Sequence, residues 1–193
     1  KTEGSEEVIV PETNTLEASV IRGARVIGIK NLKQLTDYLT GRAQVEPIES
    51  FDYEKLKSQT DDAAEPELDM VHIRGQENAK RALLIAASGG HNILMSGPPG
   101  SGKSLLAQAL GGILPEMSHE EALEVTRIYS VCGLVKDQPL IFQRPFRNPH
   151  HTTSAVAVIG GGTWPRPGEI SLAHRGVLFL DEMPEFARNV IEA

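Results

Sequence analysis

Residues 97–104 form the motif of this chain whose chemistry is most specific. They match the pattern G-x-x-x-x-G-K-[ST], in which a glycine-rich loop wraps around phosphate groups. Glycines let backbone N–H groups come close to phosphate oxygens, and the start of the following helix favours the same anion. The lysine can then reach the β- and γ-phosphates, and the serine hydroxyl can ligate Mg²⁺. The predicted nucleotide-binding residues are Gly97, Pro98, Pro99, Gly100, Ser101, Gly102, Lys103 and Ser104.

Two adjacent acids, Asp181 and Glu182, follow the apolar run Val177–Leu180. A buried parallel strand delivers its last residues to the sheet edge where ligands bind in open α/β folds. There Asp181 can hold Mg²⁺ together with Ser104, and Glu182 can orient and deprotonate an attacking water. An acidic strand end alone is a weak signal, but this one lies 77 residues after Ser104. The two motifs together predict a nucleoside triphosphatase with Glu182 and Lys103 as its catalytic residues.

The elements expected around these motifs alternate between helix and strand. A strand over Asn92–Ser96 would precede the phosphate loop, and a helix over Lys103–Leu110 would follow it. Alanine- and leucine-rich residues predict another helix over Gln76–Ala87. Residues 118–121, Ser-His-Glu-Glu, read as a capping box that opens a third helix. With Val177–Leu180 as a strand buried on both faces, the sequence predicts an α/β fold with a parallel sheet and flanking helices.

The first 42 residues predict a small piece of strand–helix–strand–helix order. Its strands are expected over Val8–Val10 and Val26–Ile29, with a short helix from Asn14 or Thr15 to about Val20 between them. Apolar residues at helical spacing, from Leu32 to Leu39, predict the second helix. A piece of this size does not make a secure core alone.

The formal charge of −7 belongs to residues 46–69, which hold nine acids and two lysines. Such a charged, proline-containing stretch is typical of a solvated linker.

The longest apolar run has six residues, against about 18 for a membrane helix, and the single cysteine excludes an internal disulfide. We therefore expect a cytoplasmic protein that makes no use of a membrane.

Residues 138–168 contain three arginines, Arg144, Arg147 and Arg166, and no acid. One interpretation is a basic loop that contacts nucleic acid. The other is a structural insertion whose arginines pair with phosphate or with neighbouring subunits. His150 and His151 lie in the same stretch, but adjacent histidines of a strand point to opposite faces, so we expect no zinc site.

Several stretches resemble the magnesium-chelatase-like AAA+ ATPases of the ComM/YifB group. The resemblance covers residues 69–193 and rests on the phosphate loop, on Gly75–Gln76, on residues 86–92 (AASGGHN), on residues 144–152 (RPFRNPHHT) and on residues 166–176 (RPGEISLAHRG). It implies the P-loop parallel sheet of an AAA+ fold, an adenine site near Gln76, and hairpin insertions within 138–168. Residues 8–42 resemble the end of a Lon-protease-like domain more weakly.

The resemblance also implies a division into domains and a function. The implied domains are 1–42, the end of a Lon-protease-like domain; 43–68, an acidic linker; and 69–193, the first part of an AAA+ domain. Such proteins are similar to ring-forming, usually hexameric ATPases, and the ComM-type members act as DNA helicases that promote branch migration in transformation. The alternatives are a chelatase-type subunit that drives Mg²⁺ insertion into a porphyrin, an ATP-dependent protein remodeller, and an ATP-binding module without catalysis.

The 11 residues after Glu182 leave no room for the two further strands, sensor residue, arginine finger and helical lid of an AAA+ core. We therefore expect a fragment that binds ATP weakly and hydrolyses it negligibly by itself.

Overall fold

The computed structural model describes residues 7–21, 23–48, 53, 54, 56, 57, 68–135 and 139–192. The chain divides into two compact units. The first comprises residues 1–63 and 135–140, and the second comprises residues 64–134 and 141–193. No helix in the described ranges is long and apolar enough to cross a membrane. The domain boundaries expected at 42 and 68 stay predictions, because the residues between them are described only in part.

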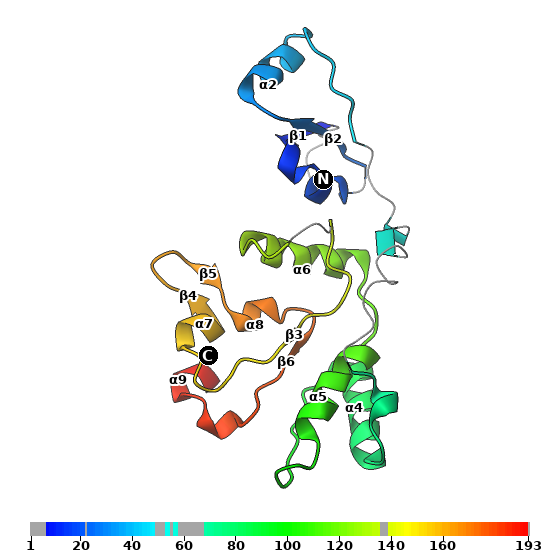
Figure 1. Cartoon of the computed structure of the whole chain (residues 1–193), viewed down its shortest axis with the longest axis vertical. Coiled ribbons are helices and arrows are strands. Elements are labelled where there is room, and N and C mark those ends of the chain that lie inside the picture. Colours follow the sequence, from blue (N-terminus) through cyan, green and yellow to red (C-terminus); the bar gives the residue numbers. More distant parts are fainter. Residues whose placement is uncertain are drawn as a thin grey trace. The chain divides into compact units, whose positions relative to one another are not determined.

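The first unit is built on two parallel strands, β1 (Glu7–Pro11) and β2 (Arg25–Ile29), as Figure 1 shows. Between them lie the 3-10 turn η1 (Glu12–Asn14) and the short helix α1 (Thr15–Ser19), and α2 (Leu32–Leu39) follows β2. The Asn31 side chain starts α2 by accepting a hydrogen bond from the Gln34 backbone. Val26 and Ile27 are fully buried. The expected order of strand, helix, strand and helix is confirmed.

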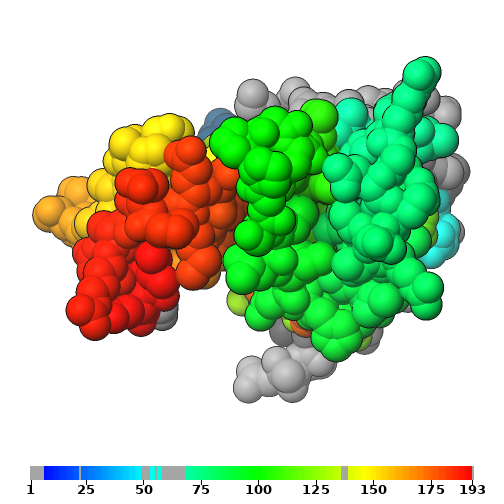
Figure 2. Space-filling view, turned by 90° about the horizontal axis from the view of Figure 1, so that it is seen from below, coloured from blue at the N-terminus to red at the C-terminus, as the bar shows by residue number. Residues whose placement is uncertain are grey.

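The helices that precede and follow the phosphate loop open the second unit. They are the 3-10 turn η2 (Met70–His72), α4 (Glu77–Gly89), α5 (Lys103–Leu110) and the 3-10 turn η3 (Gly111–Ile113). Helices α4 and α5 lie side by side, and Figure 2 shows them forming one continuous surface. Leu83 of α4 is fully buried, and Leu106 of α5 is nearly so. The start and end of α5 agree with the prediction, because Gly102 and Gly111 flank a run of good helix formers.

Helix α6 (His119–Val131) begins with the predicted capping box. The Ser118 hydroxyl accepts a hydrogen bond from the Glu121 backbone N–H, and the Glu121 carboxylate accepts one from the Ser118 backbone. After α6 come β3 (Phe146–Arg147), α7 (Ala155–Ile159), β4 (Gly160–Gly161), β5 (Arg166–Pro167), α8 (Glu169–Leu172), β6 (Val177–Leu178), the 3-10 turn η4 (Met183–Glu185) and α9 (Arg188–Ile191).

Two small sheets organise this last part of the chain. Strand β6 pairs with β3 in parallel, and a backbone hydrogen bond of 2.8 Å from Phe179 to Arg147 continues the pairing by one residue. Strands β4 and β5 form an antiparallel hairpin. One buried hydrophobic cluster contains Val158 of α7, Val190 of α9 and Phe186. Helix α7 therefore shares a core with the residues that follow Glu182.

The prediction of a strand over Asn92–Ser96 is wrong for this structure. These residues form neither helix nor strand, and Leu94 is 84 % exposed. A strand needs a partner for its backbone N–H and C=O groups, and no described strand pairs with this segment. The strand expected over Val177–Leu180 forms only over Val177–Leu178. These two residues are half-buried, not buried on both faces, and pair with β3 in parallel. The coarser prediction, a mixed α/β chain, is confirmed.

Candidate functional site

The phosphate loop turns back on itself between residues 97 and 103. Gly100 and Gly102 have left-handed backbone angles, with φ of 76° and 83°, which residues with a Cβ atom rarely adopt. This turn brings the Lys103 ammonium group to the carbonyl oxygens of Gly97 (3.0 Å) and Pro98 (3.1 Å). The turn therefore places the Lys103 ammonium group against the first two residues of the loop. Lys103 and Ser104 are the first residues of α5, whose positive N-terminal end lies at the loop.

Gln76, expected near the adenine, lies beside this loop. Its side-chain amide donates a hydrogen bond to the Ser101 carbonyl oxygen at 3.3 Å. Its backbone is left-handed, with φ of 60°, immediately before α4 begins. A left-handed conformation costs a non-glycine residue energy, so tertiary contacts must hold it. The start of α4 and the phosphate loop are thus connected through one side chain.

The two predicted motifs meet at Ser104 and Asp181. The Ser104 hydroxyl donates a hydrogen bond to Asp181 Oδ2 at 2.9 Å, across 77 residues of sequence. The other carboxylate oxygen, Oδ1, accepts a hydrogen bond of 3.0 Å from the Glu182 backbone N–H. Strand β6 pairs with β3 in parallel and ends three residues before Asp181, so this pairing sets the direction from which the acid approaches. Ser104, Asp181 and Glu182 therefore lie in one place.

The donor set at this point suits a hard divalent cation and a nucleotide. A hydroxyl and a carboxylate oxygen are the ligands that Mg²⁺ takes when substrate phosphates and waters supply the rest. Among the described residues there is no group of three or more His, Cys, Asp or Glu that could hold a metal ion unaided. Ser104 and Asp181 would hold Mg²⁺, and the loop amides with Lys103 would hold the phosphates.

His151 is a residue of this site that the sequence interpretation missed. Its Nδ1 lies 3.3 Å from Glu182 Oε2. The rings of His150 and His151 are only 4.1 Å apart, because residues 148–153 form no strand and the alternation of faces does not apply there. The argument from opposite faces is therefore wrong for this pair. Its partner Glu182 is 31 residues away, a separation that no local pattern reveals.

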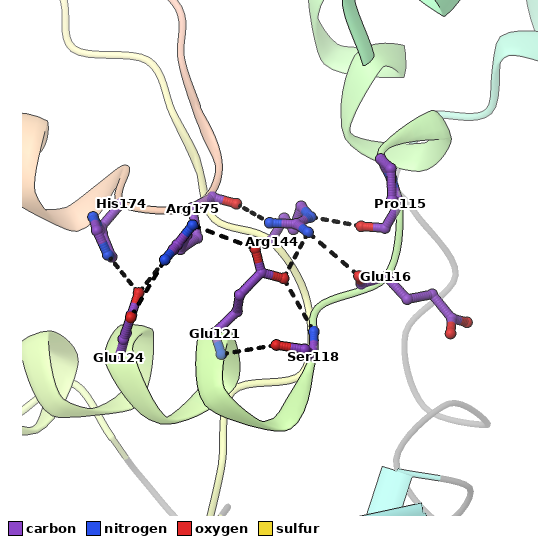
Figure 3. A network of polar contacts seen from close by, with 8 residues as sticks. All are labelled: Pro115, Glu116, Ser118, Glu121, Glu124, Arg144, His174 and Arg175. Carbon is purple, nitrogen blue, oxygen red and sulfur yellow. Dashed lines mark hydrogen bonds and ion pairs between the residues drawn. The ribbon is translucent and has the colours of Figure 1, made fainter. Parts of the chain in front are cut away.

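The acid-free segment 138–168 does not present three free cations. The Arg147 guanidinium makes two hydrogen bonds to the Glu169 carboxylate, one of them 2.8 Å long, and this pairing raises the arginine pKa above its usual value. Arg144 binds the Glu121 carboxylate at 2.9 Å and donates to three backbone carbonyl groups, those of residues 115, 116 and 175 (Figure 3). Only Arg166 of the three is exposed. These contacts support the interpretation of a structural insertion, with acids of this chain as the partners of its arginines.

A second ion pair joins α6 to the turn before β6. Arg175, which has a left-handed φ of 59°, makes two hydrogen bonds to Glu124, and His174 lies 3.0 Å from the same carboxylate (Figure 3). The hydrogen bonds from Arg175, followed by the contact with His174, lower the pKa of Glu124 to about 2. At neutral pH this carboxylate is ionised and connects α6 with the start of β6.

The family model described as "Magnesium chelatase, subunit ChlI" matches residues 69–193. The chain belongs to this magnesium chelatase family. Its curated relatives include the uncharacterized protein YifB of Escherichia coli (strain K12), with 43% identity over 186 residues, which are 96% of this chain and 35% of the relative. Competence protein ComM of Haemophilus influenzae is 46% identical over 192 residues, 97% of this chain and 36% of the relative. The ComM-like, magnesium-chelatase-type resemblance is therefore confirmed, and the chain spans about a third of the length of these relatives.

Proposed function

We propose that this member of the magnesium chelatase family is the nucleotide-binding part of an ATP-hydrolysing AAA+ motor. The hydrogen bond between Ser104 and Asp181 carries the proposal, because it joins a phosphate loop to an acid pair across 77 residues. Ser104 and Asp181 are assigned to Mg²⁺, and Lys103 to the β- and γ-phosphates. Glu182 is assigned to orient and deprotonate the attacking water.

Each of these groups has a stated task in the transfer of a phosphoryl group to water. The loop amides and Lys103 bind and neutralise phosphate charge, which is the larger part of catalysis in this chemistry. Bound Mg²⁺ supplies further charge neutralisation at the phosphate oxygens. The Glu182 carboxylate, one residue beyond the acid that binds Ser104, takes the proton that the water loses. We further propose the left-handed Gln76 as a contact of the nucleotide base, because its side chain lies at the loop.

The work that hydrolysis drives is proposed to be the remodelling of DNA by a ring of identical subunits, a hexamer. The resemblance to the ComM group and the 46% identity to a competence protein support this choice. The family description supports a second candidate, an ATPase subunit that drives metal insertion by a partner protein. A protein remodeller is the third possibility.

ATPase rates of the full-length protein, measured with and without forked DNA, test this proposal. We expect forked DNA to raise the rate and the forks to be unwound. Glu182→Gln should bind ATP but lower kcat by about 10²-fold or more, since a general base contributes that much. Glu185→Gln, an exposed acid of η4, is the matched control and should keep the wild-type rate.

Each outcome of this measurement tests a different part of the proposed function. An absence of ATP hydrolysis would refute the motor itself. Hydrolysis that DNA leaves unchanged, without unwinding, would refute the DNA function and favour a metal-insertion or protein-remodelling partner. Full activity of Glu182→Gln would show that the water-activating residue is wrongly assigned.

A further inference from the structure

The carboxylate of Glu182 has little to hold it in place. The residue has a left-handed backbone, with φ of 53° and ψ of 44°, and its side chain is 66% exposed. Its backbone N–H is bound to Asp181, which fixes the main chain but leaves the side-chain torsions free. Within the described ranges, the one ion pair of this carboxylate is the contact of 3.3 Å with His151 Nδ1. An exposed glutamate with free torsions would spend most of its time away from any single position.

His151, by contrast, is held from two sides. Its ring meets the ring of Phe186 edge-on, with centroids 6.5 Å apart, and lies beside the ring of His150. Phe186 is buried with Val158 and Val190, so the surface that supports the histidine belongs to the core shared by α7 and α9. The His151 side chain is 27% exposed. Its ring can therefore act as a fixed hydrogen-bond partner.

We propose that His151 is a positioning residue that holds the Glu182 carboxylate through a hydrogen bond from Nδ1–H. The inference rests on the proposed function, in which Glu182 activates water. A base must lie within hydrogen-bond reach of the proton that it removes, and a fixed imidazole limits the carboxylate to fewer orientations. Because His151 is packed against Phe186, the orientation of Glu182 depends on the core that α7 and α9 share.

Steady-state kinetics of the full-length protein separate positioning from binding. His151→Ala should lower kcat about tenfold, less than Glu182→Gln does, while the dissociation constant of a fluorescent ATP analogue stays at the wild-type value. His151→Asn should recover most of the rate, because its amide N–H can take the place of Nδ1–H. His91→Ala is the matched control, an exposed histidine remote in sequence from both residues, and should leave both quantities unchanged.

A second measurement detects the contact without any hydrolysis. In the 193-residue chain, the imidazole resonance of His151 is assigned by its loss in His151→Asn. We expect this resonance to move in Glu182→Gln and to stay in place in Glu185→Gln. A resonance that does not respond to Glu182→Gln would overturn the contact.

The other outcomes of the kinetic measurements separate the positioning role of His151 from the proposed function. If the wild-type protein hydrolyses ATP and His151→Ala keeps or exceeds its kcat, the positioning role is refuted while the proposed function stands. If His151→Ala loses nucleotide affinity as well, and His151→Asn recovers neither quantity, the histidine acts on the fold and not on Glu182. If the wild-type protein hydrolyses no ATP, the proposed function and the positioning role fall together.

Discussion

At the scale of single residues, Lys103 shows how the loop arranges itself around a positive charge. Its ammonium group donates hydrogen bonds to the carbonyl oxygens of Gly97 and Pro98, two neutral acceptors of the loop. Phosphate oxygens are stronger partners for an ammonium ion than neutral carbonyl groups are. We therefore expect the Lys103 ammonium group to bind the phosphates of the nucleotide directly. Removal of this side chain should act first on the affinity for the nucleotide.

Lys103→Ala should lower the affinity of the full-length protein for ATP about 10- to 100-fold, since a hydrogen bond to a charged group contributes about 1.5–3 kcal/mol. Titration calorimetry measures this directly. Lys33→Ala removes an equal charge from an exposed position of α2 and should leave the affinity unchanged. An unchanged affinity of Lys103→Ala would mean that the phosphates bind elsewhere.

At the scale of elements, the parallel pair of β3 and β6 determines where Asp181 and Glu182 lie. Gly176 directly precedes β6, and its backbone passes so close to the Pro145 carbonyl group that a Cβ atom would collide with it. The Val177 backbone N–H binds this same carbonyl oxygen at 2.8 Å. A side chain at position 176 would therefore separate the strands and displace the acids that follow.

Gly176→Ala should destabilise the chain by about 1–3 kcal/mol, the usual cost of forcing an extra carbon into a filled space. Urea unfolding followed by circular dichroism gives this difference. Gly111→Ala is the control, because its backbone is helical, with φ of −55°, and open space surrounds the added carbon. It should be neutral or slightly stabilising. Equal stabilities of the two variants would contradict the close approach at Gly176.

Helices were predictable from the sequence because their signals are local. The capping box at Ser118 and the glycines around α5 lie within a few residues of the ends that they define. The strand expected over Asn92–Ser96 failed because a strand depends on a partner distant in sequence. The same limit explains why the contacts of His151 with Glu182 and of Arg147 with Glu169 were not foreseen. Residue types and spacing predicted the candidate site, but the contacts that support it are non-local.

At the scale of the whole chain, the charge of −7 is concentrated in residues 46–69, and from Val71 onward 11 basic and 11 acidic residues balance. Within this balanced part, ion pairs of α6 hold the segments that lead to β3 and β6 (Figure 3). Hydrogen bonds, first from the Ser118 backbone and then from Arg144, also lower the pKa of Glu121. Acid should therefore loosen the second unit by protonating these carboxylates, and net charge alone does not describe the chain's response to pH.

Glu124 makes this response measurable. Its pKa falls on folding from a usual value of 4.5 to about 2, chiefly because Arg175 donates hydrogen bonds to it. A carboxylate of lowered pKa stabilises the folded state above pH 4.5, and this stabilisation is lost as the pH falls from 4.5 toward 2. The urea midpoint of Glu124→Gln should therefore lie below that of the wild type at pH 7 and converge with it near pH 2. Glu120→Gln, at an exposed position of the same helix, should follow the wild type throughout. A Glu124→Gln midpoint that stays equally low down to pH 2 would mean that packing of this side chain, and not its charge, connects α6 with the turn before β6.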